Sequence, residues 1–199
     1  MRVLPRQPRQ PATDPGDLDE PGVVERARQD PRAFAPLYTR YAPPVYGYCY
    51  HRLSSRQAAE DATSITFTRA LASLASYRGP SFRAWIFGIA HHVVADALRA
   101  RSTDASLDAA EAVVDAAPSP EALALASEEG RQLLALLTHL PPEQQRILEL
   151  RLVGLTSADI GEVLGLRRGT VDVAQYRAIG RLRAVLGMTP KTREARRDA

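Results

Sequence analysis

Apolar residues recur every three or four positions along two long parts of the chain, which predicts amphipathic helices. The first part runs from about residue 30 to residue 101, and the second from about residue 120 to residue 186. Neither part shows the strict alternation of apolar and polar residues that is typical of a half-buried strand. The expected fold class is therefore all-α, with two small helical domains joined by a flexible acidic linker.

The first part divides into four helical segments. We expect Pro43 and Pro44 to break the helix between the first two, because proline has no amide proton and disfavours a helical residue before it. The third segment has an apolar face made of Ala59, Thr63, Phe67, Ala70 and Leu74. The fourth follows a turn and a capping Ser81, and its apolar face consists of Phe82, Trp85, Ile86, Ile89, Val93, Ala97 and Leu98.

Aromatic residues at helical spacing usually belong to a core, and we expect this of Phe67 and Trp85. Aromatic rings beside arginines at the start of a helix also suit stacking on unpaired bases. The candidates for such stacking are Arg78, Phe82, Arg83 and Trp85.

The second part contains the run LTSADIGEVLGLRRGTVDVAQYRAIGRLR, residues 155–183. Thr156 and Asp159 have capping-box spacing, and Gly165 suits a left-handed helix end. We expect Thr170 to cap a second helix. Helix, glycine turn and capped second helix is the pattern of a helix-turn-helix, whose second helix enters the DNA major groove. An ordinary helical hairpin has the same spacing, but five arginines favour nucleic acid: Arg167, Arg168, Arg177, Arg181 and Arg183.

Composition shifts divide the chain further. No Lys or Arg occurs between Ser102 and Gly130, whereas acidic residues and two prolines do. The expected units are a disordered proline-rich leader (1–21), a helical domain (22–101), an acidic linker (102–121), a helix-turn-helix domain (122–187) and a basic tail (188–199).

Charge and cysteine content narrow the function classes. The formal net charge is +3, and Lys191 is the only lysine, so the positive charge is nearly all arginine. Arginine binds phosphate and guanine well, although a biased genome also enriches it. The single Cys49 excludes an internal disulfide and fits a reducing cytosol. No signal peptide or membrane-spanning run is visible, so we expect a cytoplasmic protein without membrane insertion.

Enzymatic and metal chemistry find little support in the sequence. There is no phosphate-binding loop, nucleophile elbow or dinucleotide fingerprint. A zinc set of Cys49, His51, His91 and His92 is conceivable, but adjacent histidines on a helix point about a hundred degrees apart and no CxxC accompanies them. We expect no catalytic residue, cofactor or metal.

Three segments in order, AEDATSITFTRALASLASYRG, FRAWIFGIAHHVVADALRAR and LPPEQQRILELRLVGLTSADIGEVLGLRRGTV, resemble the two conserved domains of a bacterial sigma factor of the extracytoplasmic-function (ECF) group. The resemblance implies a subunit that binds core RNA polymerase and directs promoter-specific initiation. It implies that a region 2-like bundle docks on polymerase and opens the −10 element. It also implies that a region 4-like helix-turn-helix reads the −35 element of promoter DNA. An anti-sigma factor is a further implied partner.

The resemblance assigns expected roles by position. The polymerase-facing residues are Glu60, Asp61 and Ser64. The −10 and melting residues are Arg78, Ser81, Phe82, Arg83, Trp85, His92 and Arg99. The −35 residues are Arg167, Arg168, Thr170, Asp172, Val173, Tyr176 and Arg177.

This chain departs from the family pattern at several of these positions. Ser64-Ile65 stands where many members have Gln-Glu, and His92 where asparagine is common. Asp172, Val173 and Ala174 replace a Lys, a Ser and an Arg, and Gln175 occupies an apolar position. We therefore expect an unusual promoter preference.

Two other readings stay open from the sequence. One is a stand-alone helix-turn-helix regulator that binds DNA without polymerase. The other is a sigma-like interaction protein that no longer reads promoters, which the residues 172–175 suggest.

Overall fold

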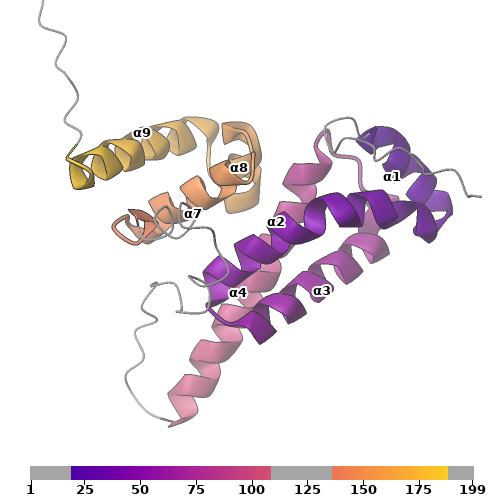
Figure 1. The fold of residues 1–199 in the computed structure, drawn as a ribbon, viewed down its shortest axis with the longest axis horizontal. Helices are drawn as coiled ribbons and strands as arrows, with labels where there is room; N and C mark the ends of the chain where they lie inside the picture. The colour runs from indigo at the N-terminus through magenta and orange to yellow at the C-terminus, as the bar shows by residue number, and fades with distance from the viewer. Residues whose placement is uncertain (1–18, 109–135, 188–199) are drawn as a thin grey trace, which may run out of the picture.

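The computed structural model describes residues 19–108 and 136–187, and in these ranges every regular element is a helix and none is a strand (Figure 1). The all-α prediction is confirmed. The leader, most of the linker and the tail expected from the sequence lie outside the described residues. The elements are α1 (Glu20–Gln29), η1 (Pro31–Phe34), α2 (Ala35–Leu53), α3 (Arg56–Ser73), η2 (Leu74–Ser76), α4 (Phe82–Asp108), α7 (Pro142–Leu152), α8 (Ser157–Leu164) and α9 (Arg168–Val185).

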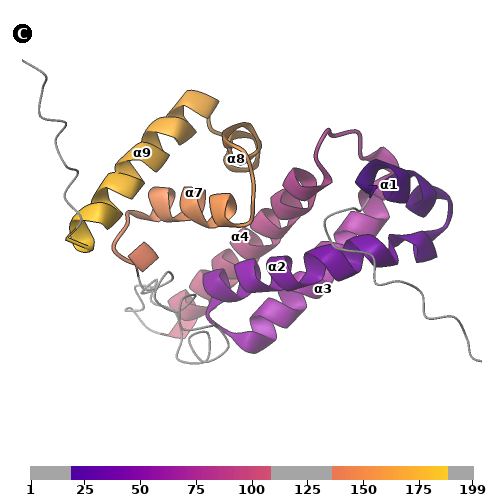
Figure 2. The same cartoon turned by 45° about the horizontal axis from the view of Figure 1, so that its top comes forward.

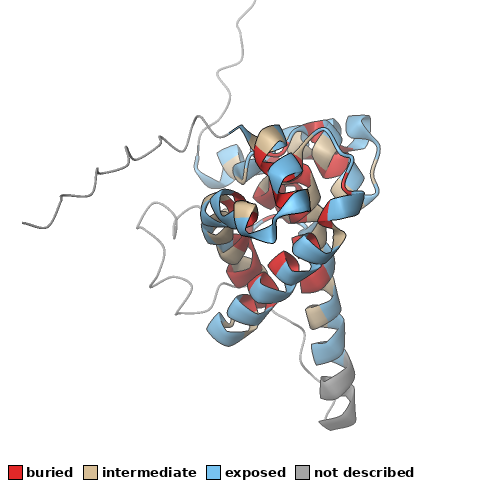
Figure 3. Ribbon diagram, turned by 90° about the vertical axis from the view of Figure 1, so that its right-hand side faces the viewer, coloured by how far each residue is buried: buried red, intermediate tan, exposed pale blue. Residues whose placement is uncertain are grey.

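Helices α1 to α4 form a bundle in which α2, α3 and α4 pack side by side (Figures 1 and 2). Its core is rich in aromatic rings, and the ring of Phe82 contacts those of Phe34, Tyr41 and Tyr77. Figure 3 shows the buried residues on the sides of the helices that face one another. The apolar face expected for the third segment is buried as predicted, in α3 and η2. Helix α4 continues past residue 101 into the stretch expected to be linker.

The predicted break at Pro43 and Pro44 is wrong, because α2 runs through both prolines. The two rings deprive the carbonyls of Thr39 and Arg40 of their helical amide partners. Thr39 and Pro43 are exposed, so water can reach this side of the helix. Packing of the opposite side, which includes the fully buried Val45, overrides the local preference.

Helices α7, α8 and α9 form the helix-turn-helix unit. Thr156 and Asp159 make the predicted capping box at the start of α8, and Gly165 ends that helix with φ +67°. The predicted cap at Thr170 is wrong, because α9 already begins at Arg168. Only Leu166 and Arg167 separate Gly165 from α9. The Leu166 amide donates back to the carbonyl of Gly161 at 2.8 Å, which closes the turn early.

The two helical units touch each other in this structure. Helix α8 lies against α4 (Figure 2), and apolar residues of both units belong to one continuous cluster of buried side chains. Among the described residues, no helix is long and apolar enough to cross a membrane.

Candidate nucleic-acid interface

The loop before α4 is held in place by arginine contacts with carbonyl oxygens. Arg28 donates to the carbonyls of Leu74 and Tyr77. The Nη1 of Arg78 donates to Ala75 at 2.7 Å and to Tyr77 at 2.8 Å. Ser81 caps α4 as predicted, since its hydroxyl accepts from the Ala84 amide at 3.1 Å. This loop therefore presents a fixed backbone beside the first turn of α4.

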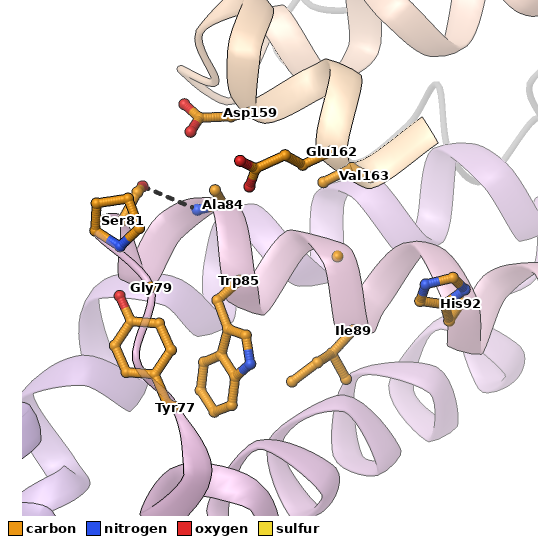
Figure 4. Close-up of a pocket in the computed structure, with 12 residues that line it drawn as sticks. Tyr77, Gly79, Ser81, Ala84, Trp85, Ile89, His92, Asp159, Glu162 and Val163 are labelled. Carbon is orange, nitrogen blue, oxygen red and sulfur yellow. Dashed lines mark hydrogen bonds between the residues drawn. The ribbon is translucent and has the colours of Figure 1, made fainter. Parts of the chain in front are cut away.

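Trp85 lies at the edge of the aromatic core. Its ring centroid is 4.7 Å from that of Tyr77, and the side chain is partly exposed where the sequence predicted core burial. Figure 4 shows the Tyr77 and Trp85 rings next to each other, with His92 two turns farther along α4. These residues line a cavity of about 360 Å³, and one flat ring face suits base stacking.

Two other predicted residues of α4 are engaged inside the protein. Phe82 is only 2% exposed, so it does not reach the surface in this conformation. The guanidinium of Arg83 lies 5.7 Å from the Tyr41 ring centroid, and its Nη1 donates to the carbonyl of Val153 at 2.8 Å. Val153 follows α7, so the Arg83 contact joins the two helical units.

Arg99 is exposed near the middle of α4, where it forms an ion pair with Asp96. A hydrogen bond from Arg69 and the charge of Arg99 hold the pKa of Asp96 below its ordinary value. Arg99 therefore lies on a surface that already contains a carboxylate.

The residues predicted to face polymerase lie together on α3. Glu60 and Ser64 line a groove of about 560 Å³ between α2 and α3, with Tyr38 and Phe67 as its apolar floor. The rings of Tyr38 and Phe67 are 4.7 Å apart between centroids. Asp61 lies one position outside the groove and accepts from the side chain of Gln57 at 3.2 Å. The structure brings these three residues together on one helix, and their contact with polymerase stays a prediction.

The predicted −35 residues lie along the exposed side of α9. Val171, Ala174 and Ala178 form its buried side. The exposed side comprises Arg167, Arg168, Thr170, Asp172, Val173, Tyr176 and Arg177. Tyr176 is 82% exposed and Val173 50%. Arg168 and Asp172 are 3.8 Å apart, so their charges partly offset each other.

The side chain that fixes the orientation of α9 was not identified from the sequence. Arg151, at the end of α7, donates to the Leu155 carbonyl, the Ser157 hydroxyl and the Gln175 amide oxygen at 2.9, 2.7 and 2.9 Å. Gln175 follows the buried Val171 by four residues, so it shares the inward side of α9. That spacing was the available signal: a polar residue on a buried face needs a polar partner.

The structural role of Gly161 was also not identified from the sequence. A Cβ on this residue would lie 2.6 Å from the carbonyl oxygen of Leu166, so the turn between α8 and α9 requires its absence. Only glycine allows this close backbone approach.

A cluster of titratable side chains lies where α2, α4 and α7 meet. The Nδ1 of His51 is 3.0 Å from Glu149, and the Nη1 of Arg52 is 3.7 Å from the same carboxylate. The Tyr48 hydroxyl lies 3.0 Å from the Nδ1 of His91, and burial lowers the pKa of His91 to about 4. No three described His, Cys, Asp or Glu residues are placed to share a metal ion.

Comparison with known proteins agrees with this architecture. The Sigma-70 region 2 family matches residues 37–103, and the Sigma-70 region 4 family matches residues 130–182. The ECF RNA polymerase sigma factor BldN of Streptomyces coelicolor is 37% identical over 188 residues, which cover 89% of this chain and 70% of BldN. The ECF RNA polymerase sigma factor ShbA of Streptomyces griseus is 36% identical, with coverages of 82% and 93%.

Two solved structures share the fold. CnrH, in complex with the cytosolic domain of CnrY, has a TM-score of 0.60 at 20% identity and covers 84% of this chain and 97% of its own. The sigma factor RpoE from Bartonella quintana, in complex with the anti-sigma factor NepR, has a TM-score of 0.61 at 22% identity, with coverages of 79% and 98%. Taken together with the family matches and the close relatives, the helical bundle and the helix-turn-helix place this chain in the ECF group of the sigma-70 family of RNA polymerase sigma factors.

Proposed function

We propose that this chain binds core RNA polymerase and directs promoter-specific initiation through three separate surfaces. Helix α3 and its groove contact polymerase, the start of α4 contacts the −10 element, and α9 contacts the −35 element. The observation that carries the proposal is the exposed side of α9, where side chains that can read base edges lie beside arginines that can reach phosphates.

The chemistry of α9 suits an unusual −35 sequence. The Asp172 carboxylate can accept a hydrogen bond from a cytosine amino group, and Val173 can contact a thymine methyl group. Arg177 lies about one turn beyond Val173 and can bind guanine with both nitrogens of its fork. Arg167 and Arg168 sit at the helix start, where phosphates approach a helix that enters the major groove.

The −10 surface rests on Trp85 and His92. Trp85 offers a ring face to an unpaired base, and the exposed His92 offers a donor or acceptor along the same helix. Phe82 supports this surface from below through its contact with Trp85, at 5.4 Å between ring centroids. We therefore assign Phe82 a positioning role and not a DNA contact.

We also propose that an anti-sigma factor binds this chain. Both solved relatives described above carry a partner, and NepR is named as an anti-sigma factor. The groove between α2 and α3 has exposed apolar side chains at Tyr38 and Leu71, which a protein partner would cover.

Run-off transcription with purified core polymerase tests the main proposal. Core enzyme with this chain should start transcripts at defined sites, and core enzyme alone should not. Mapping of the start sites then defines the promoter. If the chain neither associates with core enzyme nor supports run-off, yet shifts a promoter duplex by itself, the stand-alone regulator is correct.

Two variants of α9 separate base reading from phosphate contact. Arg177→Ala should lower affinity by roughly 1–3 kcal/mol and relax the preference at one base pair. Arg168→Ala, the matched control, should weaken binding to all promoters alike and reduce the salt slope by about one. Equal effects of both variants on every promoter would show that α9 does not read bases, as expected for a sigma-like protein that no longer recognises promoters.

A further inference from the structure

The loop between η2 and α4 supports the ring face of Trp85. Tyr77 begins this loop, and its ring centroid lies 4.7 Å from that of Trp85 and 5.9 Å from that of Phe82. Figure 4 shows the Tyr77 and Trp85 rings beside each other. Tyr77 is only 9% exposed, so its ring supports Trp85 from within the protein. The place of the Tyr77 backbone therefore decides where the Trp85 ring face lies.

Apolar packing contributes little to holding this loop against α1. A cavity of about 410 Å³ lies between them, and its lining includes Glu20, Arg28 and Pro80. Within the loop, Gly79 has no side chain to pack and Pro80 has no amide proton to donate. The loop conformation therefore depends on hydrogen bonds that other residues donate to its carbonyls.

Arg28 of α1 provides two of these hydrogen bonds with one edge of its guanidinium. Its Nε donates to the Leu74 carbonyl at 3.4 Å, and its Nη2 donates to the Tyr77 carbonyl. The remaining nitrogen, Nη1, donates to Glu25 at 2.6 Å, one turn earlier on the same helix. A planar fork held on two sides has a fixed direction, so Arg28 fixes the spacing between η2 and the start of the loop.

Arg78 shares the Tyr77 carbonyl with Arg28 but differs in its exposure. Its Nη1 donates to Tyr77 at 2.8 Å, and the side chain is exposed on the surface that we assign to the −10 element. A DNA phosphate would compete with the carbonyl for this guanidinium, because a charged acceptor makes the stronger hydrogen bond. The Arg28 side chain is 24% exposed and points inward, so it keeps its bond to the loop when Arg78 turns to DNA.

Helix α1 is itself anchored at its other end. The Glu20 carboxylate accepts a hydrogen bond from the Tyr41 hydroxyl of α2 at 2.5 Å. The buried side of α1 consists of Val23, Val24 and Ala27. The helix lies next to η2 (Figure 2), and it precedes the Sigma-70 region 2 match, which begins at residue 37. Helix α1 therefore connects α2 rigidly to the loop.

We infer that Arg28 is a positioning residue for recognition of the −10 element and acts on Trp85 through the carbonyls of Leu74 and Tyr77. The inference rests on the proposed function, because that function assigns Trp85 to the −10 element. Arg28 contacts no DNA. It holds the loop while Arg78 binds phosphate, so the Trp85 ring face stays in place when the DNA strands separate.

The fluorescence of Trp85 tests the contact in the full-length protein, because Trp85 is the only tryptophan. Arg28→Met deletes the donors and keeps the apolar stem. The Leu74 carbonyl still accepts from the Tyr77 amide and the Tyr77 carbonyl from Arg78, so the variant should fold. The matched control is Arg26→Met, which removes an exposed arginine from the same helix.

We expect the acrylamide quenching constant of Trp85 to rise about twofold in Arg28→Met and to stay unchanged in Arg26→Met, because only the first variant frees the loop to open. Circular dichroism checks that both variants keep their helices. Equal quenching constants in the wild-type chain and in both variants would overturn the inference.

Run-off transcription at saturating concentrations of the factor tests the role in recognition. One template carries a substitution in the −10 element of the mapped promoter, and another carries a substitution in the −35 element. Arg28→Met should reduce the preference for the original −10 element about fivefold and leave the preference for the original −35 element unchanged. Arg26→Met should leave both preferences unchanged.

An equal loss of transcript on every template would show that Arg28 only stabilises the fold, and it would overturn the inference. A wild-type chain that does not distinguish the templates would instead contradict the proposed function. Arg28→Lys keeps the charge but lacks the fork, so it should recover only part of the lost −10 preference. Full recovery by lysine would overturn the role of the two placed hydrogen bonds.

Discussion

The two helical units of this chain reach stability by different means. In α1 to α4 the centre is a group of aromatic rings in edge and tilted contact, and it includes Phe34, Tyr41 and Phe82. In α7 to α9 the buried apolar side chains are small or aliphatic, such as Val171 and Ala178. Many of the contacts that define its turns are polar, and they involve the capping box and the Arg151 network.

This difference fits the surfaces of the two units. The surfaces of the first unit lie on helices that a rigid aromatic core holds in place. In the second unit, α9 must keep its orientation against α7 and α8 with few apolar atoms beneath it. Directional hydrogen bonds fix that orientation where a large core is lacking.

Removing Phe82 should have the largest effect on stability. Phe82→Ala leaves a cavity among the rings of the first unit and should lower the free energy of unfolding by about 3–5 kcal/mol in urea denaturation followed by circular dichroism. Trp85→Ala is the matched control and should have about half that effect, because the indole is partly exposed. Equal losses would mean that Trp85 is as much a part of the core as Phe82.

Removing Arg151 should affect the second unit alone. Arg151→Met deletes three hydrogen bonds from a charged donor and should destabilise α7 to α9 by roughly 1–3 kcal/mol. Hydrogen exchange should then show faster opening of α8 and α9, with α1 to α4 unchanged. Arg181→Met, which removes an exposed arginine bonded to Gln144, should change little. If α1 to α4 opened equally, the two units would unfold together.

Acidification should destabilise the protein through His91. Its pKa is lowered to about 4 by burial and by the nearby charges of His92, Arg52 and Arg146, with Glu149 acting in the opposite direction. Between about pH 6.5 and 4 the unfolded chain takes up a proton that the folded chain does not. The free energy of unfolding therefore falls as the pH falls, by about 1–2 kcal/mol after allowing for solvent screening of the partly exposed ring.

His91→Gln should remove this part of the pH dependence, measured by thermal unfolding across that range. His139→Gln changes an exposed histidine and serves as the control. An unaltered pH profile in the first variant would place the origin of acid sensitivity elsewhere.

The smallest expected effect concerns the caps of the helix-turn-helix. Thr156→Ala removes half of the capping box and should reduce stability by about 1 kcal/mol. Thr170→Ala should have an effect within about 0.5 kcal/mol, because Thr170 is exposed inside α9 and caps nothing. A larger effect at Thr170 would restore it as the start of the recognition helix.

Local chemistry was sufficient to predict part of this structure. The capping box, the left-handed Gly165 and the buried face of α3 all follow from residue type and spacing over a few positions. The start of α9 did not follow, because a bond between the Leu166 amide and the Gly161 carbonyl sets it. Such a bond depends on how the turn closes and not on the capping preference of Thr170.

Long-range packing accounts for the other differences. The continuity of α2 through Pro43 depends on neighbours contributed by α3 and α4. The contacts of Arg83 with Val153 and of His51 with Glu149 join residues 70 or more positions apart. The periodicity of a single segment gives no information about such pairings. The sequence therefore predicted a DNA contact for Arg83 and did not reveal its hydrogen bond to Val153.

The arginines bound to backbone carbonyls have a consequence for how the protein can be modified. Arg28, Arg78, Arg83 and Arg151 hold turns and helix ends through guanidinium groups whose charge is permanent in water. Lys191, the only lysine, lies outside the described residues. Acetylation of lysine side chains and amine-reactive cross-linkers therefore have no target inside the two helical units. Cross-linking studies of this factor need arginine-, carboxylate- or photo-reactive reagents.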